Sequence, residues 1–224
     1  MLYAWYDDRA ILPIRDQIVR YFSGVTGTIL DLGCGEGAFL EGLSAAGHRT
    51  YGVDRSEAAV AHCRARGLTV SEGDSLEHLG TVADGSLAGI LCSHLIEHLQ
   101  PPTAIALLGQ AHRALAAGGR LVLITPDARD LRTTERFWLD VTHVRPYPEK
   151  LLVTLLVQRG FSIARIEHLQ EPTATFAGRM AKLFLRLWFM GLMFRGDLVL
   201  VAQKDGNGSR KQPSGHGARP AKEG

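Results

Sequence analysis

The sequence is poor in cysteine, and none of its cysteines is spaced for a metal. Cys34, Cys63 and Cys92 are the only three among 224 residues, and no two of them form a CxxC pair. An odd number of widely separated cysteines excludes a disulfide framework and a zinc ribbon. We therefore expect free thiols in a reducing compartment and predict no metal.

The chain also lacks a large excess of charge. It has 25 basic and 23 acidic residues, a formal net charge of +2. Five of the basic residues lie from Lys204 onward, together with only two acidic ones, so the rest of the chain is close to neutral. The basic balance thus comes from the tail, and a nucleic-acid-binding surface on the body is not expected.

No long uninterrupted apolar run is present. The N-terminus lacks a basic region followed by a long apolar core, so we expect no signal peptide and a cytoplasmic protein. The most apolar segment, 176–194, is interrupted by charge and is too short to span a bilayer. Residues 205–224 are rich in Gly, Ser, Pro, Lys and Arg, and are predicted to be a disordered tail.

What the sequence does have is a glycine-rich turn at residues 28–40, TILDLGCGEGAFL. An apolar run ends beside an acidic residue, glycines alternate behind it, and an apolar segment of helical period follows. This order predicts a buried strand, a tight turn and a helix, with a ligand approaching the glycines closely. One interpretation is the dinucleotide pattern G-x-G-x-x-G/A, ending at Ala38. The other is D-x-G-x-G-x-G, which Asp31, Gly33, Gly35 and Gly37 match in full.

Hydrophobic patterns along the chain alternate between strand and helix. Strands are predicted at 28–32, 49–53, 68–71, 87–92, 120–124, 161–168 and 196–202. Helices are predicted at 11–22, 38–46, 58–66, 101–117 and 148–159, and an apolar helical insertion at 173–195. We expect an N-terminal helix and flap (1–27), one catalytic domain (28–204) and the tail.

Two stretches resemble class I S-adenosylmethionine (SAM) dependent methyltransferases. The D-x-G-x-G-x-G loop resembles their motif I, and LAAGGRLVL at 115–123 resembles the helix-turn-strand that follows their fourth strand. The resemblance implies a Rossmann-like, doubly wound α/β sheet of seven strands, in the order 3-2-1-4-5-7-6 with strand 7 antiparallel. It also implies SAM as cofactor. It disfavours an NAD-binding oxidoreductase, which lacks the second element.

The resemblance also implies which residues bind SAM. Asp54 ends the second strand and is expected to accept hydrogen bonds from ribose hydroxyls, because Ser56 can cap the next helix in its place. Asp74 and Ser75 are expected at the adenine, although an Asp-Ser pair is also an ordinary helix start. The full predicted set is Asp31, Gly33, Cys34, Gly35, Gly37, Asp54, Arg55, Asp74, Ser75 and Ser93.

The acceptor side is predicted from two segments. SHLIEHL at 93–99 resembles the stretch beside the transferred methyl group in small-molecule methyltransferases, and its helical spacing places His94, Glu97 and His98 on one face. A metal site is possible on that spacing, but solvated or cap-like roles for Glu97 and His98 are favoured. THVRPY at 142–147 resembles a His-x-Arg-x-Tyr/Phe segment of methyltransferases encoded with bacterial polysaccharide enzymes.

We therefore expect a saccharide or lipid-linked glycan as the acceptor. The alternative is a small hydrophobic metabolite such as a quinone precursor or a polyketide, methylated on oxygen or nitrogen. His143 and His94 are the candidate general bases, although 142–147 can also be an ordinary surface loop. The predicted substrate contacts are Glu97, Trp138, Asp140, Arg145 and Tyr147.

The insertion carries a basic stripe within an otherwise apolar helix, with Arg179, Lys182 and Arg186 at i, i+3 and i+7. That pattern suits the surface of a membrane, and contact through 176–194 is our first expectation. A lid over the pocket and a dimer contact are the alternatives. A monomer and a homodimer both remain open.

Overall fold

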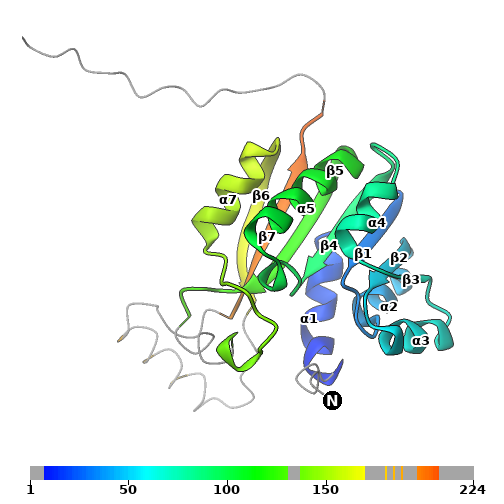
Figure 1. Ribbon diagram of the computed structural model, residues 1–224, viewed down its shortest axis with the longest axis horizontal. Coiled ribbons are helices and arrows are strands. Elements are labelled where there is room, and N and C mark those ends of the chain that lie inside the picture. The colour runs from blue at the N-terminus through cyan, green and yellow to red at the C-terminus, as the bar shows by residue number, and fades with distance from the viewer. Residues whose placement is uncertain are drawn as a thin grey trace, which may run out of the picture.

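Among the described residues, seven strands form a single sheet (Figure 1). The computed structural model describes residues 8–130, 137–169 and 196–206, with three further helical positions at Met180, Phe184 and Trp188. The strands are β1 (Thr28–Leu32), β2 (Arg49–Asp54), β3 (Val70–Glu72), β4 (Leu87–Ser93), β5 (Leu115–Pro126), β6 (Phe161–Leu169) and β7 (Asp197–Lys204).

The strand order is β3-β2-β1-β4-β5-β7-β6, as predicted. The pairs within β3-β2-β1-β4-β5 are parallel, whereas β7 runs antiparallel to both β5 and β6. β2 and β3 lie on one side of β1, and β4 and β5 lie on the other, so the direction of the strand order reverses at β1. The carboxyl ends of the parallel strands therefore meet at one edge, where such sheets bind their ligands.

Helices cover both faces of the sheet, which makes the fold doubly wound (Figure 1). In β4, Ile90 and Cys92 pack in one core cluster while Leu91 packs in the other, as the two-residue period of a strand requires. The helices are α1 (Asp8–Arg20), α2 (Ala38–Ala45), α3 (Glu57–Ala65), α4 (Ser75–Thr81), η1 (Ile96–His98), α5 (Pro101–Ala114) and α7 (Glu149–Gln158).

The N-terminal helix is fastened to the sheet at its carboxyl end. Ile18 and Phe22 are fully buried against β1 and β4 side chains. The Arg120 guanidinium donates hydrogen bonds to the carbonyls of Tyr21 (2.8 Å) and Ser23 (3.0 Å), which satisfies two of the carbonyls that a helix end leaves free. Residues 1–7 of the predicted N-terminal helix and flap (1–27) lie outside the described residues.

The junction of α5 and β5 differs from the prediction. The helix ends at Ala114, three residues earlier than expected, and β5 begins at Leu115 instead of Arg120. Leu115 is fully buried and pairs with Leu87, and the register shifts before Gly89 pairs with Arg120. Pairing with β4 therefore overrides the helical preference of Ala116 and Ala117.

Most of the predicted insertion and tail lies outside the described residues. This applies to the basic stripe of Arg179, Lys182 and Arg186 and to residues 207–224. Met180, Phe184 and Trp188 are helical, and their side chains are exposed. Within the part of the chain that the structure describes, no helix is long and apolar enough to cross a membrane.

The two glycines that flank α2 provide a matched pair for measuring the packing of the glycine loop. Gly37 and Gly47 share the same left-handed φ of +87°. A Cβ added to Gly37 would lie 2.5 Å from Leu68 Cδ1, whereas a Cβ added to Gly47 would have no neighbouring atom of the described residues within 4 Å. Gly47→Ala should therefore lower the free energy of unfolding by about 1–2 kcal/mol, the cost of the left-handed conformation. Gly37→Ala should lower it by about 1–3 kcal/mol more, through overpacking. Urea unfolding measures both, and equal losses would contradict the assignment.

Candidate active site

The loop after β1 is held against the end of β2 by its backbone. The N–H groups of Gly33 and Cys34 donate to the Val53 carbonyl at 2.8 and 3.1 Å. The Gly35 N–H donates to Asp54 Oδ2 at 2.8 Å. Within the described part of the chain, no neighbouring atom lies within 4 Å of the position that a Cβ on Gly35 would take, so the loop is open there to a ligand. These bonds fix the predicted cofactor loop beside the predicted ribose carboxylate.

Asp54 is oriented by two backbone donors. Its second oxygen, Oδ1, accepts from the Ser56 N–H at 2.8 Å. Ser56 itself caps α3 by accepting from the Ala59 N–H at 3.3 Å, so Asp54 is not needed as the cap. Each carboxylate oxygen can accept more than one hydrogen bond. Asp54 therefore keeps acceptor capacity for a pair of ribose hydroxyls.

Asp31 is a buried carboxyl group at the base of the loop. It is 1% exposed, and its Oδ2 has no hydrogen-bond partner among the described residues. Burial, and after it the negative charge of Asp54, raises the pKa of Asp31 well above its usual range. A buried acceptor without a partner is costly unless a ligand supplies donors or positive charge. SAM carries an ammonium group and a sulfonium, so these residues fit it.

The predicted adenine residues have structural partners as well. Asp74 caps α4, with Oδ1 accepting from the N–H groups of Leu76 (2.8 Å) and Glu77 (2.9 Å). Its Oδ2 pairs with Arg55. Burial opposes ionisation, but these donors outweigh it and lower the pKa of Asp74. Asp74 is therefore a helix cap in the structure, and its contact with adenine stays a prediction, as does that of the buried Ser75.

His94 follows Ser93 at the end of β4 and bridges two carboxylates. Its Nδ1 lies 3.2 Å from Glu97 Oε1, and its Nε2 lies 3.2 Å from Asp197 Oδ2. Burial alone would lower the pKa of His94, but Asp197 and Glu97 outweigh it and raise the pKa to about 10. At neutral pH the imidazole is thus a cation without a free lone pair. This argues against His94 as the general base.

Glu97 is fully buried and its carboxylate bonds to two side chains, so the solvated or cap-like role predicted for it is wrong. Its Oε2 accepts from the Thr125 hydroxyl at 3.1 Å, and its Oε1 is occupied by His94. Its backbone carbonyl accepts from the N–H groups of Val144 (2.8 Å) and Arg145 (3.3 Å). Glu97 therefore anchors the 142–147 segment to η1 through its backbone carbonyl, and its predicted contact with the acceptor stays a prediction.

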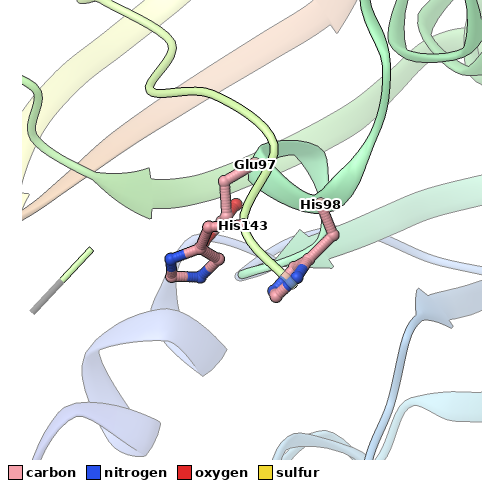
Figure 2. A group of neighbouring side chains, drawn as sticks. All are labelled: Glu97, His98 and His143. Atoms are coloured by element: carbon pink, nitrogen blue, oxygen red, sulfur yellow. The ribbon is translucent and has the colours of Figure 1, made fainter. Parts of the chain in front are cut away.

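His98 and His143 lie next to each other at this edge of the sheet. Figure 2 shows Glu97 and His98 coming from η1 and His143 coming from the segment before α7. The ring centroids of the two histidines are 4.5 Å apart. Nitrogen or oxygen atoms from the three side chains lie within 4.8 Å of one another. No sequence pattern predicts that His98 and His143, 45 positions apart, lie next to each other.

Of the other residues predicted to contact the substrate, Tyr147 lies in the core and Trp138 lies at the surface. Tyr147 is 1% exposed, packs in the core, and donates its hydroxyl to the Leu99 carbonyl at 3.0 Å, so it has a packing role instead of an acceptor contact. Arg145 lies over the Tyr147 ring at 5.2 Å. Trp138 is 62% exposed. Asp140 accepts from the N–H of Thr142 at 2.8 Å.

The profile of a family described as "Methyltransferase domain" matches residues 6–166. The chain belongs to this family. A ubiquinone biosynthesis O-methyltransferase of Methylococcus capsulatus is 32% identical over 129 residues, which cover 55% of this chain and 53% of that protein. The chain thus matches about half the length of its curated relatives.

Solved structures agree with this membership. A SAM-dependent methyltransferase from Archaeoglobus fulgidus superposes with a TM-score of 0.76 and 25% identity, covering 88% of this chain and 95% of that one. Magnesium protoporphyrin IX methyltransferase from Synechocystis, with bound SAM, superposes with a TM-score of 0.61 and 20% identity, covering 88% and 81%. The predicted class I fold and the predicted cofactor, SAM, are confirmed.

The bridge between His94 and Asp197 should make stability depend on pH. The folded-state pKa of about 10 lies above the usual 6.5, so the stabilisation is complete below about pH 6.5 and is lost as the pH rises through 10. Asp197→Asn should therefore lower the melting temperature most at pH 6 and least at pH 10. Thermal melts of both proteins across this range measure the difference. A difference that stays constant with pH would show that His94 is not held as a cation.

Proposed function

We propose that this protein transfers a methyl group from SAM to a hydroxyl group of a small apolar metabolite, of the quinone-precursor or polyketide kind. The observation that carries the proposal is the position of His143, a candidate base at the ligand-binding edge beside exposed apolar side chains. Trp138, Leu139 and Val141, two to five residues before it, are 62%, 56% and 80% exposed. The name of the Methylococcus relative points the same way.

The cofactor half would be assembled from the loop and the ends of three strands. Asp54 would accept the ribose hydroxyls, Asp31 would face the positively charged part of SAM, and Asp74 with Ser75 would border the adenine. SAM supplies an electrophilic methyl group on a good leaving group. The contribution of the protein is then to orient the acceptor and to remove its proton.

An apolar acceptor fits the second half better than a saccharide does. A sugar ring can stack on an exposed aromatic side chain, but of the two aromatic residues predicted to contact the acceptor, Tyr147 is buried and Trp138 alone is exposed. Next to Trp138 the chain presents Leu139 and Val141, which offer apolar surface without hydrogen-bonding groups. These side chains suit a ring that carries a hydrocarbon substituent.

Cofactor binding provides the first test. Asp54→Asn should weaken SAM binding by about 1.5–3 kcal/mol, roughly 10- to 100-fold, because it removes charge-assisted hydrogen bonds. Asp84→Asn, at an exposed carboxylate away from the loop, is the matched control and should bind like the wild type. Calorimetric titration with SAM and S-adenosylhomocysteine measures both. Unchanged affinity in Asp54→Asn would remove Asp54 from the site, and tight binding of NAD would refute the cofactor.

Acceptor preference is tested by methyl transfer from radiolabelled SAM. We expect transfer to a catechol with an alkyl chain, such as hexylcatechol, and little to a free or lipid-linked hexose. The reason is that hydrophobic contact contributes about 25 cal/mol per Å² of apolar surface buried. The reverse preference would restore the saccharide prediction. Transfer only to amines would replace the hydroxyl acceptor with a nitrogen acceptor.

We also propose that segment 176–194 contacts a membrane surface on its cytoplasmic side. Met180, Phe184 and Trp188 follow a helical i, i+4, i+8 spacing and are 50%, 63% and 72% exposed. The rings of Phe184 and Trp188 stack with centroids 5.8 Å apart. A helix with an apolar face and a basic stripe suits an interface with anionic lipids.

Flotation with anionic liposomes tests this contact. The double variant Phe184→Ser, Trp188→Ser should lose most of the binding of the wild type, because it lacks the two aromatic side chains that would insert into the lipid. Val157→Ser, at an exposed position of α7, is the control and should still float. If the wild-type protein does not bind liposomes, the membrane contact is refuted, and the segment is a lid over the pocket or a dimer contact. Light scattering on the same variants separates those two.

A further inference from the structure

His98 and His143 each form a hydrogen bond through Nδ1. His98 comes from η1 and His143 from the segment before α7, and their rings are tilted by 53° (Figure 2). His143 also stacks on Phe137, with ring centroids 4.4 Å apart. Both rings are partly buried. Their hydrogen bonds decide which nitrogen of each ring carries the proton.

In His143 the proton must lie on Nδ1. This nitrogen is 2.7 Å from the Phe137 carbonyl oxygen, which can only accept. The neutral ring therefore has a bare lone pair on Nε2. That nitrogen lies 3.8 Å from Asp140 Oδ2, so a proton gained there would face a carboxylate.

His98 has the same tautomer for a different reason. The Thr142 hydroxyl donates to Asp140 Oδ1 at 2.6 Å, because a carboxylate cannot donate. The hydroxyl proton is thus committed, and the Thr142 oxygen can only accept from His98 Nδ1, at 2.9 Å. In the neutral ring, His98 Nε2 therefore carries no proton. Asp140 fixes His98 through Thr142 and also faces His143.

Burial and the groups around the two rings disfavour a proton on His98. Glu97 from η1 and Asp140 from the loop face the two rings, and behind Glu97 lie His94 and Asp197, which pair with each other. Burial and the neighbouring His143 lower the pKa of His98, against the opposing effect of Glu97. Two adjacent imidazolium groups would repel each other.

We propose that His98 is the positioning partner of His143 in a paired general base, held by the Thr142–Asp140 hydrogen bonds. This inference rests on the proposed function. The hydroxyl proton of the acceptor moves to His143 Nε2, and the oxygen lone pair forms the new O–CH3 bond. The electrons of the broken S–CH3 bond stay on sulfur, which becomes a neutral thioether. The imidazolium, stabilised by Asp140, then returns its proton to water.

NMR of the ¹⁵N-labelled histidines tests the pair without any acceptor. Both rings should show the Nδ1–H tautomer near neutral pH, with signals assigned from His98→Asn and His143→Asn. Thr142→Val, which keeps the shape but removes the hydroxyl group, should abolish the single tautomer of His98. Thr142→Ser should restore it. An Nε2–H tautomer in either wild-type ring would overturn the proposal.

Kinetics with hexylcatechol test the catalytic use of the pair. Thr142→Val and His98→Asn should each lower kcat by about 10- to 100-fold, which is less than the roughly 100- to 10,000-fold that a general base contributes, because His143 itself remains. The KM for SAM should be unchanged, and the acid limb of the pH profile should move. Thr142→Ser should recover most of the rate. His62→Asn, on the exposed face of α3, is the control and should behave like the wild type.

The outcomes separate this inference from the proposed function. Wild-type turnover and pH profile in His98→Asn and Thr142→Val would overturn the pair while methyl transfer itself stands. A wild type that binds SAM yet methylates no hydroxyl group would refute the proposed function and the paired base with it. Loss of turnover in EDTA, with recovery on adding Mg²⁺ or Zn²⁺, would overturn the pair in favour of a bound cation.

Discussion

The hydrogen bonds between the loop after β1 and the end of β2 are the constraint on which the site depends. Three N–H groups of the loop donate these bonds: those of Gly33 and Cys34 to the Val53 carbonyl, and that of Gly35 to the Asp54 carboxylate. They fix the backbone at Gly35, the open position of the loop, and the orientation of the Asp54 carboxylate at the same time. Because neighbouring parallel strands end at the same edge, one set of backbone bonds positions both the loop and the carboxylate.

Much of the fold follows from local pattern. The alternation of apolar segments and glycine or polar turns was enough to locate all seven strands, and the resemblance gave their order. The error at Ala114–Leu115 arose because helix propensity favours Ala116 and Ala117, whereas pairing between Leu115 and Leu87 is a contact that no local signal reports. Long-range pairing overrode propensity there.

The site was predictable where one motif supplies it and not where packing decides. The predicted cofactor residues lie on one short loop and at the ends of neighbouring strands, so their spacing along the chain was enough to predict that they lie close together. Glu97 and Tyr147 look like acceptor contacts in the sequence, but the structure buries both and satisfies their polar groups internally. The meeting of His98 with His143 depends on the carbonyl of Glu97 holding the 142–147 segment, and no sequence pattern encodes that bond.

The antiparallel direction of β7 has a consequence for how this domain can change. Leu169 and Asp197 face each other across the β6–β7 ladder, so the 170–195 segment starts and finishes about one strand spacing, roughly 4.8 Å, apart. With its ends clamped, doubling the segment would add only about 0.6 kcal/mol of closure entropy. A longer or shorter segment between these two strands would therefore change the free energy of folding of the domain only slightly.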